Sequence, residues 1–473
     1  MDHTKRRARL IWIPVLLLFA FQILMVTKSN MDSGGIVYYL GYDSAADITH
    51  TMSATVGQRL AAAVGLLIAI EAACAAYCIR RNVSGAVTIM VLVAILLTVG
   101  LCYQTYTLPP NGSMKHFKTI LTGGVALSVG MWISRVATRL PQRYRNRVLW
   151  AGIIGMTAFV AVASVYGKLH TVNGAGGVFL GLTTSDLYKL FVILFLSLSL
   201  PELQLNNRLR FAFFLLCLVM VGTMGALNNL GDAIILSTIV LVAVLQSLGT
   251  RTFFVTGTAL AAAAVGAYSL IRARAPDSYI VTRVRNTFVA STDATVNTNY
   301  RRSVLAVMYR GVYGSGTGDT RLVANNFASQ NDYAYSGLTA IFGLSIALLV
   351  LVCIALLPIT ILLRTKECSR DPHLYSFASL AATLLLSQGI LHIGSDLNIL
   401  PLTGVTLPFI SMGGTAMATA FLSVGLAVGR RLPQARAVHL SMSMPQMKMT
   451  AIGEEIRSIW TTLRRRAERR WAR

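Results

Sequence analysis

The stretch LPLTGVTLPFISMGGT, residues 400–415, lies between hydrophobic runs that are long enough to cross a bilayer. It contains two prolines, three glycines and several hydroxyl side chains. Irregular backbone of this kind leaves N–H and C=O groups unpaired, and lipid offers them no hydrogen-bond partner. It is tolerated at membrane depth only where protein or a water-filled cavity covers it. The stretch therefore predicts a membrane protein with a working cavity beside these residues.

The composition of the whole chain is typical of a protein with many membrane spans. Hydrophobic residues make up 55% of its 473 residues, charged residues make up 13%, and the mean hydropathy is +0.62. A soluble domain carries about twice that share of charge. We therefore predict an all-α polytopic membrane protein with about twelve transmembrane helices. The apolar runs that we interpret as spans are residues 9–27, 58–79, 85–105, 118–137, 148–166, 183–201, 209–226, 231–248, 252–272, 336–363, 373–395 and 406–429.

The distribution of arginine and lysine predicts the orientation of these spans. Basic residues follow the even-numbered runs, and the N-terminus and the arginine-rich C-terminal tail fall on the same side. The positive-inside rule makes this side cytoplasmic, so both termini are predicted to lie inside. Topology and attraction to anionic lipid then explain much of the formal net charge of +24, and we predict no nucleic-acid partner.

Five regions are predicted along the chain. They are N-terminal helices at 1–167, central helices at 168–271, a large extracytoplasmic loop at 272–335, C-terminal helices at 336–430 and a basic cytoplasmic tail at 431–473. A structureless loop of this length is unusual in a compact protein and is more often functional than idle. The large loop is therefore a candidate location for the site.

The charge of this loop opposes the positive-inside trend. Between residues 272 and 331 it carries eight arginines against three aspartates. One interpretation is a solvated loop that meets anionic headgroups. The other is a binding surface for pyrophosphate, because the arginine fork matches phosphate oxygens bidentately. For the second interpretation we select Arg301, Arg302, Arg310 and Arg321.

Two segments of the central region place charged residues in apolar helices. The first is NGA followed by TSDLYK, in which Asp186 and Lys189 are three residues apart and share one helix face. Lys189 lies several residues into the expected bilayer, so it must face a cavity or a partner. Asp186 can equally cap the first turn of its helix. The second segment, NLGDA at 229–233, adds a carboxylate at Asp232.

A third segment lies at the end of the large loop. RSVLA at 302–306 and GVYGSGTG at 311–318 lead to NDYAY at 331–335, where Asp332 precedes an apolar run. Taken alone, Asp332 is most simply interpreted as the N-cap of a helix that begins near Tyr335.

The fourth segment contains His392 and Asp396, four residues apart and just before the irregular stretch. This spacing places both side chains on one helix face. A histidine in such a helix is more often a hydrogen-bonded core residue than a ligand. Because the pair lies beside the irregular stretch, proton handling is the alternative interpretation.

In this order, the four segments resemble signatures of the SEDS family, the relatives of RodA, FtsW and SpoVE. Residues 400–415 are similar to the family's LLPVTGIPLPFISYGGSS, and the earlier segments are similar to NGA…QPSELAK, QPDLGTA and HTDFIF. The resemblance implies a core of ten helices, to which our interpretation adds two. The sequence departs from the family's pattern at four places: Asn229 replaces Asp, Asp232 replaces Thr, Ala340-Ile341 replaces a glutamate pair, and His392 replaces Asn with Asp396 as an added acid.

The resemblance implies a peptidoglycan glycosyltransferase that polymerises lipid II at the outer face of the bacterial cytoplasmic membrane. Asp332 aligns with the family's catalytic aspartate and is the expected general base of an inverting reaction. No metal site is predicted and no cofactor is assigned, while a divalent cation is left open. The residues that we expect to bind substrate are Arg301, Arg302, Arg310, Arg321, Lys189, Asp186, Ser411, Gly413 and Gly414.

The same resemblance implies protein partners, namely a class B penicillin-binding protein and other membrane proteins of the divisome or elongasome. Two alternative functions stay open. A flippase for a lipid-linked precursor predicts charged residues along a membrane path, for which only Glu71 and Lys189 are clear candidates before residue 300. A catalytically impaired relative that acts as a scaffold is consistent with the missing glutamate pair.

Overall fold

The computed structural model describes most of the chain up to Gly429. The described residues are 2–31, 37–39, 49–51, 54–80, 84–107, 112–137, 141–169, 171–172, 175–176, 178–179, 182–205, 207–227, 229–288, 312, 330–367 and 372–429. All of them belong to the unit Met1–Leu432. The predicted arginines Arg301, Arg302, Arg310 and Arg321 lie outside the described residues.

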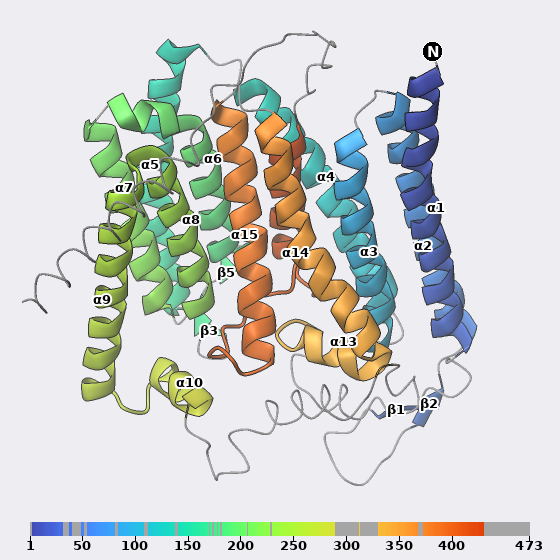
Figure 1. Cartoon of the computed structure of the whole chain (residues 1–473). Coiled ribbons are helices and arrows are strands. Elements are labelled where there is room, and N and C mark those ends of the chain that lie inside the picture. The colour runs from blue at the N-terminus through green and yellow to red at the C-terminus, as the bar shows by residue number, and fades with distance from the viewer. Residues whose placement is uncertain are drawn as a thin grey trace, which may run out of the picture. The chain divides into compact units, whose positions relative to one another are not determined.

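The described part of the chain is helical, as predicted, with three short antiparallel hairpins added (Figure 1). The helices are α1 Asp2–Met31, α2 Ala54–Arg80, α3 Ser84–Thr107, α4 Gly112–Ala137, α5 Gln142–Leu169, α6 Thr184–Leu205, α7 Asn207–Ala226, α8 Leu230–Leu248, α9 Thr250–Arg274, α10 Tyr279–Phe288, α13 Ala334–Phe342, α14 Leu344–Glu367, α15 Pro372–Asp396 and α16 Gly414–Val428. The hairpins pair β1 Val37–Tyr39 with β2 Thr49–Thr51, β3 Thr171–Val172 with β4 Ala175–Gly176, and β5 Val178–Phe179 with β6 Leu182–Thr183.

Nine helices of the described residues are long and apolar enough to cross a membrane. Shorter apolar helical stretches lie at Trp12–Thr27 and Gly414–Val428. The prediction of a polytopic all-α membrane protein is therefore confirmed. Each of the twelve predicted runs contains helix, including the two that the short break around residue 229 separates.

Three predicted boundaries are wrong. The run 336–363 is interrupted at Gly343, whose φ of 82° lies in the left-handed region that glycine enters without steric cost. The run 406–429 becomes helical only at Gly414, because the irregular stretch extends to that residue. The loop expected from residue 272 is not structureless, since α9 continues to Arg274 and α10 follows.

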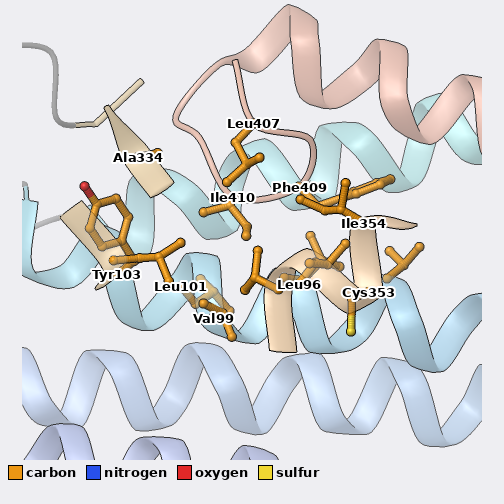
Figure 2. Close-up of a cluster of buried hydrophobic side chains, with 14 of the residues drawn as sticks. Leu96, Val99, Leu101, Tyr103, Ala334, Cys353, Ile354, Leu407, Phe409 and Ile410 are labelled. Carbon is orange, nitrogen blue, oxygen red and sulfur yellow. The ribbon is translucent and has the colours of Figure 1, made fainter. Parts of the chain in front are cut away.

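The irregular stretch Leu397–Gly413, which we call the broken segment, is covered by protein on two sides. Its Leu407, Phe409 and Ile410 belong to a buried apolar cluster with α2, α3, α4, α13, α14 and α16. Figure 2 shows these three side chains against α3 and its neighbours. Val405 belongs to a second cluster formed by α5 to α8 with α15 and α16. The covering required for irregular backbone at membrane depth is therefore present.

Glycines bring α4 and α16 close together. A Cβ atom on Gly130 of α4 would overlap the carbonyl oxygen of Leu422, and one on Gly425 of α16 would overlap that of Leu127. Small residues at helix interfaces permit such close packing in membranes, where burial from water supplies little driving force. This contact fixes α16, and with it the end of the broken segment.

Candidate functional site

The broken segment is hydrogen-bonded to the residues directly before Asp332. Gln104 of α3 donates through Nε2 to the carbonyl oxygens of Gln330 (3.1 Å) and Ile410 (3.0 Å). The backbone N–H of Met412 also donates to the Gln330 carbonyl, at 3.1 Å. Two segments that are far apart in sequence thus share one set of hydrogen bonds, and the backbone groups of the broken segment find partners in protein.

Ser411 contributes to the same network. Its Oγ accepts a hydrogen bond from the Leu407 N–H and donates one to the carbonyl of Asn331, both at 2.9 Å. We predicted that this hydroxyl binds substrate. In the structure it has a partner within the protein both as a donor and as an acceptor of hydrogen bonds. Gly413 precedes α16 and Gly414 is its first residue.

Asp332 lies in the turn before α13 and is half-buried. A Cβ atom on Gly404 of the broken segment would lie 3.8 Å from its Oδ2. Arg283 of α10 donates through Nη1 to the Leu402 carbonyl at 2.8 Å and exerts its positive charge on Asp332. Burial raises the pKa of the Asp332 carboxyl above its ordinary value, and the Arg283 charge opposes this rise.

The capping alternative for Asp332 is wrong. Helix α13 begins at Ala334, and no side chain makes a cap hydrogen bond from the N-cap position at Tyr333. The first turn is instead satisfied by Asp396 at the end of α15. Its Oδ2 accepts from the Ser336 N–H and its Oδ1 accepts from the Ser336 Oγ, both at 2.7 Å. Among the described residues no hydrogen bond reaches the Asp332 carboxylate.

His392 lies one helical turn before Asp396. Its Nδ1 is 2.6 Å from the carbonyl oxygen of Val405 in the broken segment. Its Nε2 is 4.0 Å from Asp396 Oδ2, and both residues are fully buried. The expected pairing of His392 and Asp396 on one helix face is present, and each side chain contacts a different neighbouring segment.

A second charged cluster joins α6 to α8. Lys189 Nζ lies 2.7 Å from Asp186 Oδ1 and 2.9 Å from Asp232 Oδ1. The side chain of Lys189 is 3% exposed, that of Asp186 is 7% exposed and that of Asp232 is 19% exposed. The Asp186–Lys189 spacing was predictable within one helix, whereas Asp232 comes from another helix. We call these three residues the lysine triad.

The lysine triad is connected to the broken segment. Thr183 donates a hydrogen bond to Asp186, and its hydroxyl lies 2.7 Å from that of Thr415 at the start of α16. Gly231, the residue before Asp232, packs against Thr403 and Val405 so closely that a Cβ atom there would overlap both. The four segments singled out in the sequence therefore meet around the broken segment.

Sequence reasoning missed Arg283 and Gln104 as members of this site. Arg283 was counted among the loop arginines without being selected, because its position depends on α10, a ten-residue helix inside the expected loop. Gln104 is a glutamine within an apolar run, and a polar amide at such a place was the signal available in the sequence. The structure buries it completely. Among the described residues, no group of three or more His, Cys, Asp or Glu side chains is placed to hold a metal ion.

These observations define a multi-pass helical membrane protein with a polar site where several helix ends meet a broken segment. The sequence profile of the cell cycle proteins FtsW, RodA and SpoVE matches residues 82–430. The chain therefore belongs to this family, as its motifs indicated. Helices α1 and α2 precede the matched residues.

Similar proteins agree with this assignment. A probable peptidoglycan glycosyltransferase FtsW of Enterococcus hirae is 32% identical over 31% of this chain and 37% of its own length. A protein of the same name from Coxiella burnetii is 27% identical over 64% of this chain and 83% of its own length. A solved chain from a study of a peptidoglycan synthase complex superposes with a TM-score of 0.55 at 20% identity, covering 72% of this chain and 95% of that one. The last comparison supports the fold.

Proposed function

We propose that this protein is an inverting peptidoglycan glycosyltransferase that polymerises lipid II at the outer face of the bacterial cytoplasmic membrane. The observation that carries the proposal is Asp332, a half-buried carboxylate beside Arg283, without a hydrogen bond among the described residues. Curated relatives named as probable peptidoglycan glycosyltransferases support the reaction class. In Figure 1, α10 and α13 lie at the opposite end of the helices from the N-terminus. With the N-terminus inside, as the charge distribution predicts, Asp332 lies outside.

The chemistry requires a base for the hydroxyl of the acceptor sugar and a cation for the leaving pyrophosphate of the donor. A hydroxyl of the acceptor sugar attacks the anomeric carbon of the donor, and its proton passes to Asp332. The bond from that carbon to the lipid pyrophosphate breaks, and the electron pair leaves with the pyrophosphate. Because attack comes from the opposite face, the anomeric centre inverts. The raised pKa of Asp332 makes the carboxylate a better proton acceptor than an ordinary aspartate.

Arg283 is the described arginine best placed to act on the leaving group. Its guanidinium is held by the Leu402 carbonyl and its charge reaches Asp332. A positioned cation at the site of developing charge stabilises the transition state. We assign this role to Arg283 and retain Arg301, Arg302, Arg310 and Arg321 as further candidates.

The lysine triad suits a different part of the substrate. Two carboxylates surround one ammonium group, so its formal charge is negative. A negative cluster repels pyrophosphate, and because its carboxylates are already paired with Lys189 it shapes the wall of the site without taking part in the reaction. We therefore assign Asp186 and Lys189 to the sugar-binding side of the site, with the broken segment, including Gly413 and Gly414, along the path of the lipid.

The test is polymerisation of labelled lipid II by the purified protein, with and without its class B penicillin-binding partner. We expect polymer from the wild type, none from Asp332→Ala, and wild-type yield from Asp277→Asn, an exposed acid between α9 and α10. Equal polymer from the Asp332→Ala protein would remove this residue from the mechanism. No polymer from the wild type with its partner present would overturn the enzymatic proposal.

One observation favours a scaffold as the second candidate. The positions of the family's glutamate pair are Ala340 and Ile341, and both side chains are buried in α13. A scaffold predicts that Asp332→Ala binds the penicillin-binding partner normally and supports its transpeptidase activity, with no polymer from any variant. The flippase alternative finds less support, because Glu71 accepts a hydrogen bond from Gln22 and Lys189 is paired twice.

A further inference from the structure

The last turn of α15 contacts both segments that flank Asp332. Asp396 accepts two hydrogen bonds from Ser336 in the first turn of α13, and Asp332 lies four residues before Ser336. The intervening residues lead directly from the candidate base into the helix. Holding the first turn of α13 therefore limits how far the Asp332 backbone can move.

The second flank is the broken segment. His392 binds the Val405 carbonyl at 2.6 Å, and the preceding residue, Gly404, is the one that faces Asp332. Gly404 has a φ of 66°, in the left-handed region, so its backbone direction depends on being held there. The His392 hydrogen bond holds the carbonyl group of Val405, the residue that follows Gly404. The wall opposite the carboxylate is thus fixed from the same helical turn.

The hydrogen-bond pattern separates positioning from proton handling. A carbonyl oxygen accepts only, so His392 Nδ1 must carry the hydrogen, and the neutral ring then has its lone pair at Nε2. That nitrogen has no hydrogen-bond partner among the described residues and lies 4.0 Å from Asp396. Both Asp396 oxygens accept from Ser336. The hydrogen bonds of this pair described above lead to Ser336 and to the Val405 carbonyl, and neither of these is the Asp332 carboxylate.

We propose that His392 and Asp396 form a positioning clamp, which holds α13 and the broken segment at a fixed separation around Asp332. This inference rests on the proposed glycosyltransferase function. It assigns a role to two residues at which the chain departs from the family's pattern. In this chain a carboxylate at the end of α15 anchors α13, a helix that lacks the family's glutamate pair.

The experiment compares Asp396→Asn with Ser395→Ala in the full-length protein. Asparagine keeps one acceptor oxygen and puts an N–H donor in place of the other, so it can no longer accept from both the Ser336 N–H and the Ser336 hydroxyl, and the charge that strengthens both bonds is removed. Ser395 is a matched control, because it is buried in the same turn and its hydroxyl donates to the His392 carbonyl of its own helix, its one hydrogen bond among the described residues. Lipid II polymerisation is measured per folded molecule as kcat and KM across pH, together with amide hydrogen exchange at residues 333–337.

For Asp396→Asn we expect kcat to fall by about 10²-fold, the effect of a misplacement of about 1 Å, with little change in KM. Amide exchange at residues 333–337 accelerates. The charged or titratable group that faces Asp332 from another helix is Arg283 of α10. Those that face Asp396 are Tyr103 of α3 and Tyr335 of α13. Since Arg283 is untouched, the acid limb of the pH profile stays in place. His392→Gln, which keeps a donor for Val405, retains more activity than His392→Leu.

Three results would overturn the clamp. Full kcat in Asp396→Asn would do so, as would unchanged exchange at 333–337. A lost ionisation in the pH profile would assign proton handling to Asp396 instead. If the wild type makes no polymer, the proposed function fails, and the exchange measurement still decides whether Asp396 anchors α13.

Discussion

The lysine triad and the Asp332 site place the same kind of side chain in opposite situations. In the triad, Asp186 and Asp232 both lie within 3 Å of the Lys189 ammonium. Asp332 is half-buried, and among the described residues it has the charge of Arg283 acting on it and no hydrogen bond. A carboxylate whose oxygens are occupied stabilises the fold, whereas one left without a donor is available to a substrate hydroxyl. The two regions therefore differ in whether their carboxylates have a hydrogen-bond or ion-pair partner within the protein.

The strongest challenge to this comparison is Lys189→Met, which leaves two buried carboxylates without a cation. Breaking a buried ion pair by removing one partner costs about 3–5 kcal/mol. We expect a large loss of folded protein, measured as thermal unfolding and monodispersity in detergent. Arg251→Met, a substitution at an exposed position of α9, is the control. Wild-type stability of Lys189→Met would show that the triad is not a structural element.

Gly231→Ala tests how the triad is coupled to the broken segment. The added methyl group overlaps Thr403 and Val405, so either α8 or the broken segment must shift. Overpacking of this kind costs about 1–3 kcal/mol. We expect a lower unfolding temperature together with reduced polymerisation, whereas Gly222→Ala, which meets open space on α7, changes neither. Unchanged stability would mean that the two regions are independent.

Arg283→Gln changes the surroundings of Asp332 and leaves the lysine triad unchanged. Because a base must be ionised, activity is lost as the pH falls through the pKa of Asp332. The Arg283 charge lowers this pKa, so its removal raises the pKa further and moves the acid limb of the pH profile to higher pH. We expect about a tenfold loss of kcat at low pH, since leaving-group stabilisation is also lost. An unmoved acid limb would separate Arg283 from Asp332.

The sequence was sufficient for features that depend on neighbours in the chain. Hydropathy located the spans, and a spacing of three residues predicted the Asp186–Lys189 pair. The sequence was insufficient where the partner of a charged or hydrogen-bonding side chain comes from another helix. Asp232 reaches Lys189, and Asp396 reaches Ser336, over separations that no local pattern records. For the same reason the local sequence suggested Asp332, the nearest carboxylate along the chain, as the cap of α13, whereas Asp396 accepts the hydrogen bonds of its first turn.

The most direct test of the account compares Asp332→Asn with Asp232→Asn in one preparation, by lipid II polymerisation and thermal unfolding. Each substitution removes one carboxylate charge with almost no change in shape. We predict that Asp332→Asn abolishes polymerisation at wild-type stability, and that Asp232→Asn lowers stability while each folded molecule stays active. An active Asp332→Asn protein, or an Asp232→Asn protein that is fully stable and inactive, would contradict the distinction between the two sites.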